Sequence, residues 1–210
     1  MNTTREAVRT ATGARRRGRP PSDAPERILD AGYEVLARDG YSGLSLAKVA
    51  AASGLNKALI SYYFGSRTGL VAAVAKRVSE TITDEVLGGL ESPRSPRELV
   101  EGLADGLWRV MDGDPGLQRV YFDLSSQAVI EPEIGAIMIE MKEGHRAILR
   151  ELLRGLEPEI DESALDGIVV FLIASLEGFS LERLGRGDSP ALKAARAHFV
   201  DSACAVIASG

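Results

Sequence analysis

Cysteine and histidine are scarce in this chain of 210 residues, which has one cysteine and two histidines. The single thiol, Cys204, excludes an internal disulfide framework and is typical of a protein from a reducing cytoplasm. The histidines, His145 and His198, are too few and too far apart for an obvious zinc site. The composition, 45% hydrophobic and 26% charged, is otherwise that of a globular protein. We therefore expect a cytoplasmic protein.

Long apolar segments are also missing. The longest strongly apolar run covers Ile168 to Leu176, which is nine residues and too short to span a bilayer. The N-terminal basic cluster has no apolar segment before it, so we do not expect a secretory signal. No repeat and no alternating strand pattern follows residue 22.

The motifs of common enzymes are absent as well. A helical di-iron site needs a glutamate three residues before histidine, but Lys142 and Ala195 occupy those positions before His145 and His198. Cys204 lies in no known motif, and the chain has no glycine-rich phosphate loop. We expect no enzymatic activity, no cofactor and no metal site.

Charge is distributed unevenly along the chain, although the net charge is only −5. Residues 1–67 carry 11 Lys and Arg against 6 Asp and Glu, whereas residues 68–210 carry 14 against 24. A basic end on an acidic body suits a protein whose N-terminal module lies on phosphates while its body is repelled from them.

Helical periodicity, capping residues and helix breakers predict an all-α fold. The expected helices run from Asp23 to about Asp39, Ser45 to Gly54, Asn56 to Phe64, Ser66 to Gly88-Gly89, from Ser95 onward, from Asp114 to Glu131-Pro132, from about Glu133 to Leu156, from about Glu162 to Leu184, and from Ser189 to about Ala208.

Two short helices around Gly54 form the most informative stretch. Ser45 and Asn56 are good N-caps, and Gly54 suits the left-handed residue that ends a helix. Ile60 and Phe64 are four residues apart on the buried side of the second helix. This pattern is that of a DNA-binding helix-turn-helix, in which the second helix enters the major groove. Taken alone, it is equally consistent with an ordinary helical hairpin.

The residues that follow favour DNA binding. The segment Tyr62-Tyr63-Phe64-Gly65-Ser66-Arg67-Thr68-Gly69-Leu70 resembles the signature of the TetR family of transcriptional regulators, and the resemblance covers about Ala24 to Val74. It implies a three-helix DNA-binding domain at 23–67 and a helical-bundle domain for effector binding and dimerisation at 68–210. Residues 1–22 are expected to form a disordered basic arm.

The resemblance also implies which residues contact DNA. Ser45, Tyr63 and Arg67 occupy positions that contact phosphate, and Lys57 matches a common lysine of the recognition helix. Ala58, Leu59 and Ser61 depart from the residues that are commonest in the family at these positions. The predicted DNA-binding residues are Arg15, Arg16, Arg17, Arg19, Ser45, Lys57, Ala58, Leu59, Ser61, Tyr62, Tyr63 and Arg67.

By the same resemblance, the body has an effector pocket between the fifth and eighth helices, with apolar walls and a few polar groups. The candidates are Trp108, Met111, Tyr121, Phe122, Gln127, Met138, Met141, His145, Phe171 and Glu177, each of which could equally be plain core. The implied protein is a homodimer through its last two helices and a repressor that a small molecule releases from a palindromic operator. The alternative is a helical protein–protein adaptor that does not bind specific DNA.

Overall fold

A computed structural model describes residues 23–90 and 92–210 of the chain. Within these ranges the regular structure is entirely α-helical, which confirms the expected all-α fold. The helices are α1 (Ala24–Gly43), α2 (Leu46–Ser53), α3 (Lys57–Phe64), α4 (Arg67–Leu87), α5 (Pro96–Gly113), α6 (Pro115–Ala128), α7 (Pro132–Leu156), α8 (Glu162–Arg186) and α9 (Pro190–Ala208).

Serine caps begin several of these helices where the sequence placed them. Ser45, Ser66, Ser95 and Ser189 are all extended, and the hydroxyl of each accepts a hydrogen bond from the amide three residues later. Asp23 differs, because its backbone is not extended and its side chain caps no amide of α1. The start of α1 thus has a proline in its first turn but no side-chain cap.

Gly40 bends α1 instead of ending it. Its φ of 71° and ψ of 175° interrupt the helix, and one further helical turn reaches Gly43. A positive φ is readily available to glycine alone, and a Cβ at this position would lie 3.3 Å from the Asp123 carboxylate. The bend brings Tyr41 against α6.

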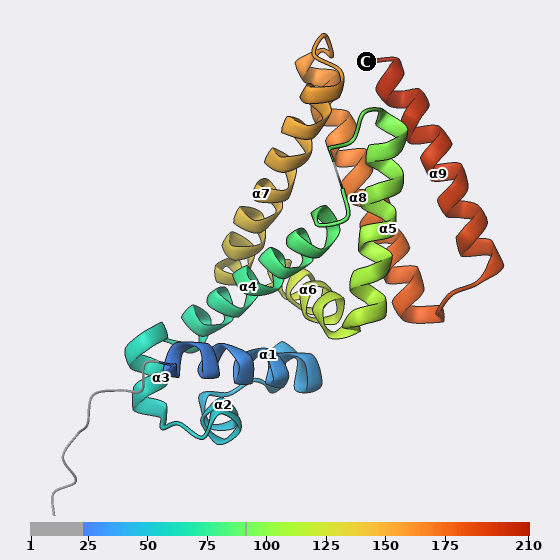
Figure 1. Cartoon of the computed structure of the whole chain (residues 1–210). Helices are drawn as coiled ribbons and strands as arrows, with labels where there is room; N and C mark the ends of the chain where they lie inside the picture. The colour runs from blue at the N-terminus through green and yellow to red at the C-terminus, as the bar shows by residue number, and fades with distance from the viewer. Residues whose placement is uncertain (1–22, 91) are drawn as a thin grey trace, which may run out of the picture.

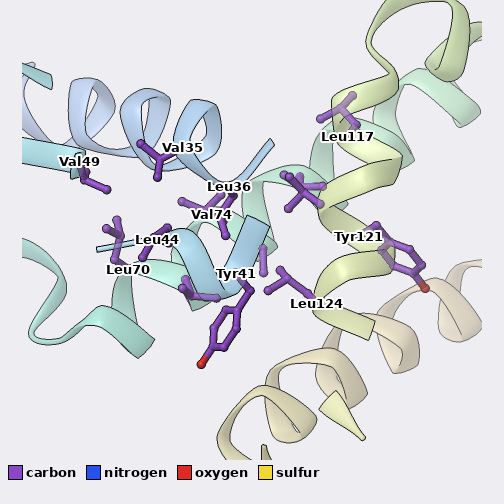
Figure 2. Close-up of a cluster of buried hydrophobic side chains, with 14 of the residues drawn as sticks. Val35, Leu36, Tyr41, Leu44, Val49, Leu70, Val74, Leu117, Tyr121 and Leu124 are labelled. Atoms are coloured by element: carbon purple, nitrogen blue, oxygen red, sulfur yellow. The ribbon is translucent and has the colours of Figure 1, made fainter. Parts of the chain in front are cut away.

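The three N-terminal helices lie at one end of the molecule, and α4 leads from them into the body formed by α5 to α9 (Figure 1). One hydrophobic cluster extends across this junction. Val35, Leu36 and Val74 lie in the same cluster as Leu117 and Leu124 of α6 (Figure 2). The N-terminal helices therefore share a core with the body, and the expected boundary at residue 67 is no break in packing.

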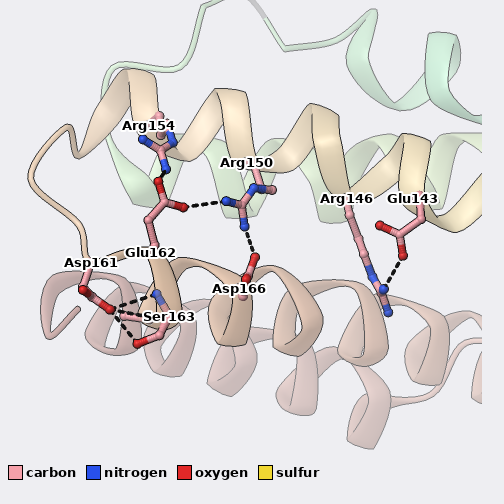
Figure 3. A network of polar contacts seen from close by, with 9 residues as sticks. Glu143, Arg146, Arg150, Arg154, Asp161, Glu162, Ser163 and Asp166 are labelled. Carbon is pink, nitrogen blue, oxygen red and sulfur yellow. Dashed lines mark hydrogen bonds and ion pairs between the residues drawn. The ribbon is translucent and has the colours of Figure 1, made fainter.

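A second cluster fills the body between α5, α7, α8 and α9, with Leu165 and Leu172 of α8 fully buried. An ion-pair network joins α7 to α8 along their exposed edge (Figure 3). Arg150 contacts Glu162 at 2.6 Å and also pairs with Asp166. Exposed pairs contribute at most about 1 kcal/mol each. The network therefore fixes the alignment of the two helices more than it stabilises them.

Helix α8 is the one helix in the described ranges that is long and apolar enough, by length and composition alone, to cross a membrane. The sequence analysis considered only the apolar run of nine residues. Charged residues are also few along most of the 25-residue helix that contains this run. Core helices of soluble proteins meet the same criterion, and α8 packs against α5, α7 and α9.

Candidate functional site

Helices α2 and α3 form the predicted helix-turn-helix. Gly54 adopts the left-handed conformation, with φ 68° and ψ 17°, and so turns the chain between them. The Asn56 carboxamide accepts a hydrogen bond from the Leu59 amide at 2.9 Å and starts α3. Val49 and Ile60 are fully buried, which fixes the two helices on α1 and α4. The turn geometry thus follows from residues that the sequence identified.

The outward face of α3 carries the side chains that the sequence assigned to DNA. Lys57, Ala58, Ser61 and Tyr62 are exposed, whereas Leu59 and Tyr63 are partly buried. The Tyr62 side chain is the most exposed of the large apolar residues at this end, at 74%, and its ring meets Tyr63 edge-on at 5.1 Å. The Lys57 ammonium, the Ser61 hydroxyl and the Tyr62 phenol are exposed and can hydrogen-bond phosphates and base edges.

Lys57 is the uncompensated cation of this face. Lys48 of α2 lies 2.7 Å from Asp39, which also bonds Arg38. Hydrogen bonds from Arg38 and Lys48 hold the pKa of the Asp39 carboxyl well below its usual range. Within the part of the chain that the structure describes, Lys57 makes no ion pair, so its charge is available to an external anion.

Arg67 is engaged inside the protein. Its guanidinium donates to the carbonyls of Leu44, at 3.1 Å, and of Tyr41. It also lies over the Tyr41 ring, 4.1 Å from the centroid. Arg67 thus joins the start of α4 to the end of α1.

Tyr41 connects the N-terminal helices to the corner between α6 and α7. Its amide donates to the Asp123 carboxylate at 2.5 Å, and its hydroxyl bonds Glu131. Next to it, the Thr68 hydroxyl donates to Glu133 at 3.0 Å. We call Tyr41, Arg67, Asp123 and Glu131 the junction cluster. It is a direct polar link between the helix-turn-helix and the body.

The body contains a cavity of about 130 Å³ between α4, α5, α6, α7 and α8. Its walls are mostly aliphatic side chains, among them Ile82, Val86, Leu103, Leu107, Ile173 and Leu176. The sequence missed these residues because aliphatic positions on helix faces look like ordinary core. It also missed the contribution of α4, which supplies one wall.

Polar groups gather at one side of the cavity. The Tyr121 hydroxyl donates to Glu177 Oε1 at 2.5 Å, and the Lys142 ammonium lies 3.0 Å from the same oxygen. Burial, followed by the hydrogen bond to Glu177, raises the pKa of Tyr121. The Glu177 carboxylate is therefore neutralised by one cation and one phenol from neighbouring helices.

His145 links this group to α4. Its Nε2 lies 2.9 Å from the Ser79 hydroxyl, and its ring centroid is 6.5 Å from that of Tyr121. Burial lowers the pKa of His145, with the nearby Glu177 acting in the opposite direction. The imidazole is thus held neutral between the cavity and the helix that leads to α3.

Three of the ten predicted effector residues, Tyr121, His145 and Glu177, line this cavity. Met141 lines a neighbouring cleft between α4 and α7. The other candidates lie outside the cavity, namely Trp108, Met111, Phe122, Gln127, Met138 and Phe171.

Trp108 is one of the candidates that lie outside the cavity. Its indole donates to Asp188 at 3.3 Å, and Arg183 and Arg196 flank its ring. It therefore holds α5 to the turn between α8 and α9. The predicted arm contacts of Arg15, Arg16, Arg17 and Arg19 lie outside the described residues.

Comparison with known proteins agrees with this architecture. The sequence model of bacterial regulatory proteins of the tetR family matches residues 28–74, which include the helix-turn-helix. The regulator BetI of Rhizobium meliloti is 24% identical over 134 residues, which are 64% of this chain and 66% of that protein. The repressor AcnR of Corynebacterium glutamicum is 25% identical over 182 residues, covering 82% of this chain and 87% of that protein.

Solved structures share the fold over most of the chain. A TetR-family transcriptional regulator from Rhodococcus sp. superposes with a TM-score of 0.74 at 22% identity, covering 89% of this chain and all of that one. A transcriptional regulator from Saccharomonospora viridis, solved in complex with choline, gives 0.69 at 18% identity, covering 86% and 95%. The helix-turn-helix end of the chain belongs to the TetR family of transcriptional regulators, and most of the chain shares the fold of the solved regulators. The match to BetI spans just under two thirds of that protein.

Proposed function

We propose that the chain is a homodimeric repressor that binds a palindromic operator through α3 and leaves it when a small molecule occupies the cavity. The observation that carries this proposal is the two-sided character of α3. Ile60 is fully buried while Lys57, Ser61 and Tyr62 face solvent. A short helix held by one face and polar on the other is built to be inserted into a groove.

The surface of α8 supports dimerisation. Small and apolar residues recur on it at helical spacing and remain exposed: Gly167, Val170, Ala174, Gly178 and Leu181. A Cβ added at Gly167 or Gly178 would meet no atom within 4 Å. A helix this apolar, with only 28% of its most apolar window buried, suits packing against the same helix of a second copy. Two recognition helices could then read half-sites about 34–36 Å apart.

Helix α4 offers the route between the effector and DNA. Ile82 and Val86 near its C-terminal end line the cavity, and Arg67 at its start belongs to the junction cluster. An effector that binds better when α4 is displaced would shift the protein toward the state that does not fit DNA. By linkage, operator DNA must weaken effector binding by the same factor.

The repressor role is supported by AcnR, whose match spans most of both chains. The choline complex of the S. viridis regulator shows that a protein of this fold holds a small organic ligand. The effector of this chain depends on the residues that line its own cavity, so neither relative identifies it.

Substitution of Lys57 tests the proposal. Lys57→Ala and Tyr63→Phe should each weaken operator binding, measured by fluorescence anisotropy at about 150 mM salt, where non-specific phosphate binding is suppressed. The dimer fraction in analytical ultracentrifugation should not change. Arg94→Ala is the matched control, because it removes one exposed cation from the loop before α5, at the end of the molecule away from α3. Parental affinity in Lys57→Ala would contradict the assignment of α3, and a folded dimer without operator binding would favour the adaptor.

A further inference from the structure

The size and the walls of the cavity suit a small, largely aliphatic ligand. Nine of the fifteen lining residues are Leu, Ile or Val, and Tyr121 is the one aromatic carbocycle among them. An aliphatic cavity of about 150 Å³ is known to bind benzene. The 130 Å³ present here therefore suits a ligand of comparable size.

A cation would gain little in this cavity. Glu177, the carboxylate that lines it, is already paired with the Lys142 ammonium at 3.0 Å and accepts a hydrogen bond from Tyr121. Lys142 also lies over the Tyr121 ring, 5.8 Å from its centroid, so this ring already has a cation beside it. A buried cation would therefore lose its hydration without a free partner.

An anion is disfavoured for two other reasons. The cleft between α4 and α7, which shares Thr83, His145 and Ile148 with the cavity, carries more acidic than basic groups. Its charged residues are Lys76, Glu80, Asp84 and Glu140. Inside, burial lowers the pKa of His145, so the imidazole supplies no positive charge to an anion. The cleft repels anions and the cavity does not compensate them.

Gln118 provides the polar contact for an uncharged ligand. It is 4% exposed and lines the cavity from α6. In the described ranges no hydrogen bond joins its side-chain amide to another residue, and the amide is not sealed from the space around it. The amide of a residue that lines a cavity can offer two donors and one acceptor to whatever occupies the cavity. A ligand with one hydroxyl or carbonyl group can bond to this amide without bringing a charge.

We propose that the cavity binds a small uncharged aliphatic molecule with a single hydroxyl- or carbonyl-type group, held by Gln118, and discriminates against cations and anions of the same shape. The inference rests on the proposed effector role of the cavity and names the chemical class of its ligand. It separates this chain from the S. viridis regulator, whose structure contains choline.

Three compounds with the same trimethyl-headed skeleton test the charge preference. 3,3-dimethylbutanol is neutral, choline is its cationic counterpart with nitrogen in place of the quaternary carbon, and 3,3-dimethylbutanoate is an anion. Saturation-transfer NMR titrations of the full chain without DNA, up to about 10 mM ligand, would detect a Kd of about 1 mM. We expect the alcohol to bind at least about tenfold more tightly than either ion, since each must give up hydration without a partner. Equal or tighter binding of an ion, or no saturable binding of the alcohol, would overturn the proposal.

Two variants locate the binding. Gln118→Met should weaken alcohol binding about three- to tenfold, the loss expected for one hydrogen bond. Gln127→Met is the matched control, because Gln127 lies on the same helix outside the cavity, and it should bind as the parent does. Ile173→Phe should abolish binding by filling the space. Parental affinity in Gln118→Met would refute the assigned contact, and parental affinity in Ile173→Phe would refute the cavity as the site.

A negative result in the ligand titrations and a negative result in the operator assay have different meanings. A protein that binds operator but not the alcohol would retain the DNA-binding function and lose the ligand class. A protein that binds the alcohol in the cavity but no operator would retain the ligand class and lose the proposed repressor.

Discussion

Replacing Arg67 by lysine separates two roles that the sequence could not distinguish. A lysine keeps the positive charge that a phosphate contact needs. It cannot donate to the carbonyls of Tyr41 and Leu44 at once, nor lie flat on the Tyr41 ring as the guanidinium does at 4.1 Å. Arg67→Lys therefore removes the internal contacts of Arg67 while preserving its charge.

The expected loss follows from these contacts. A hydrogen bond from a charged donor contributes about 1.5–3 kcal/mol, and a cation–π contact contributes about 0.5–1 kcal/mol at an exposed site. Lysine can keep one of the two hydrogen bonds, and Arg67 is only partly buried. We therefore expect the free energy of unfolding to fall by about 2 kcal/mol, or the Tm to fall by about 4–8 °C for a chain of this size. Urea unfolding followed by circular dichroism measures the loss.

Arg119→Lys is the control, because Arg119 is exposed on α6 and should change stability by less than about 0.5 kcal/mol. If Arg67→Lys were as stable as the parent, the junction cluster would contribute little to stability.

Three further results are expected. Asn56→Ala should lower the free energy of unfolding by about 1 kcal/mol, because the Leu59 amide loses its cap, and thermal unfolding would show it. Leu172→Ala, at a fully buried position of α8, should lower it by about 2–5 kcal/mol in urea, and a loss below about 1 kcal/mol would contradict the packing. Burial lowers the pKa of His145, so the unfolded chain binds a proton there that the folded chain does not. Stability should therefore fall as pH drops below about 6.5, and His145→Gln should reduce that fall between about pH 7.5 and 5.5.

The helices could be predicted from sequence because their signals are local. A serine before an apolar periodic segment, as at Ser66 and Ser189, needs only its own helix to act as a cap. Gly54 likewise determines the turn after α2 through its own left-handed conformation, without contacts from distant helices. The sequence predicted that the first helix ends at about Asp39, but the extra turn beyond Gly40 depends on Tyr41 packing against α6, which no local pattern contains.

The candidate site could be predicted only in part, for the same reason. The face of α3 follows from helical spacing, so the exposure of Lys57 and Tyr62 was foreseeable. The cavity is formed where five helices meet, and its walls are aliphatic residues such as Val86 that resemble core in sequence. Aromatic side chains were expected to line it, yet Trp108 packs between arginines at the surface. Only tertiary packing distinguishes a side chain that lines the cavity from one that lies in the core or at the surface.

Selection of bound fragments from a random duplex pool tests the central claim most directly. The purified full chain would be used at about 150 mM salt, with Lys57→Ala as the parallel selection. The account predicts a palindrome whose half-sites lie about one helical turn or a multiple of it apart, with no enrichment by the variant. A folded parent dimer that enriches no sequence, or a variant that recovers the same palindrome, would contradict it.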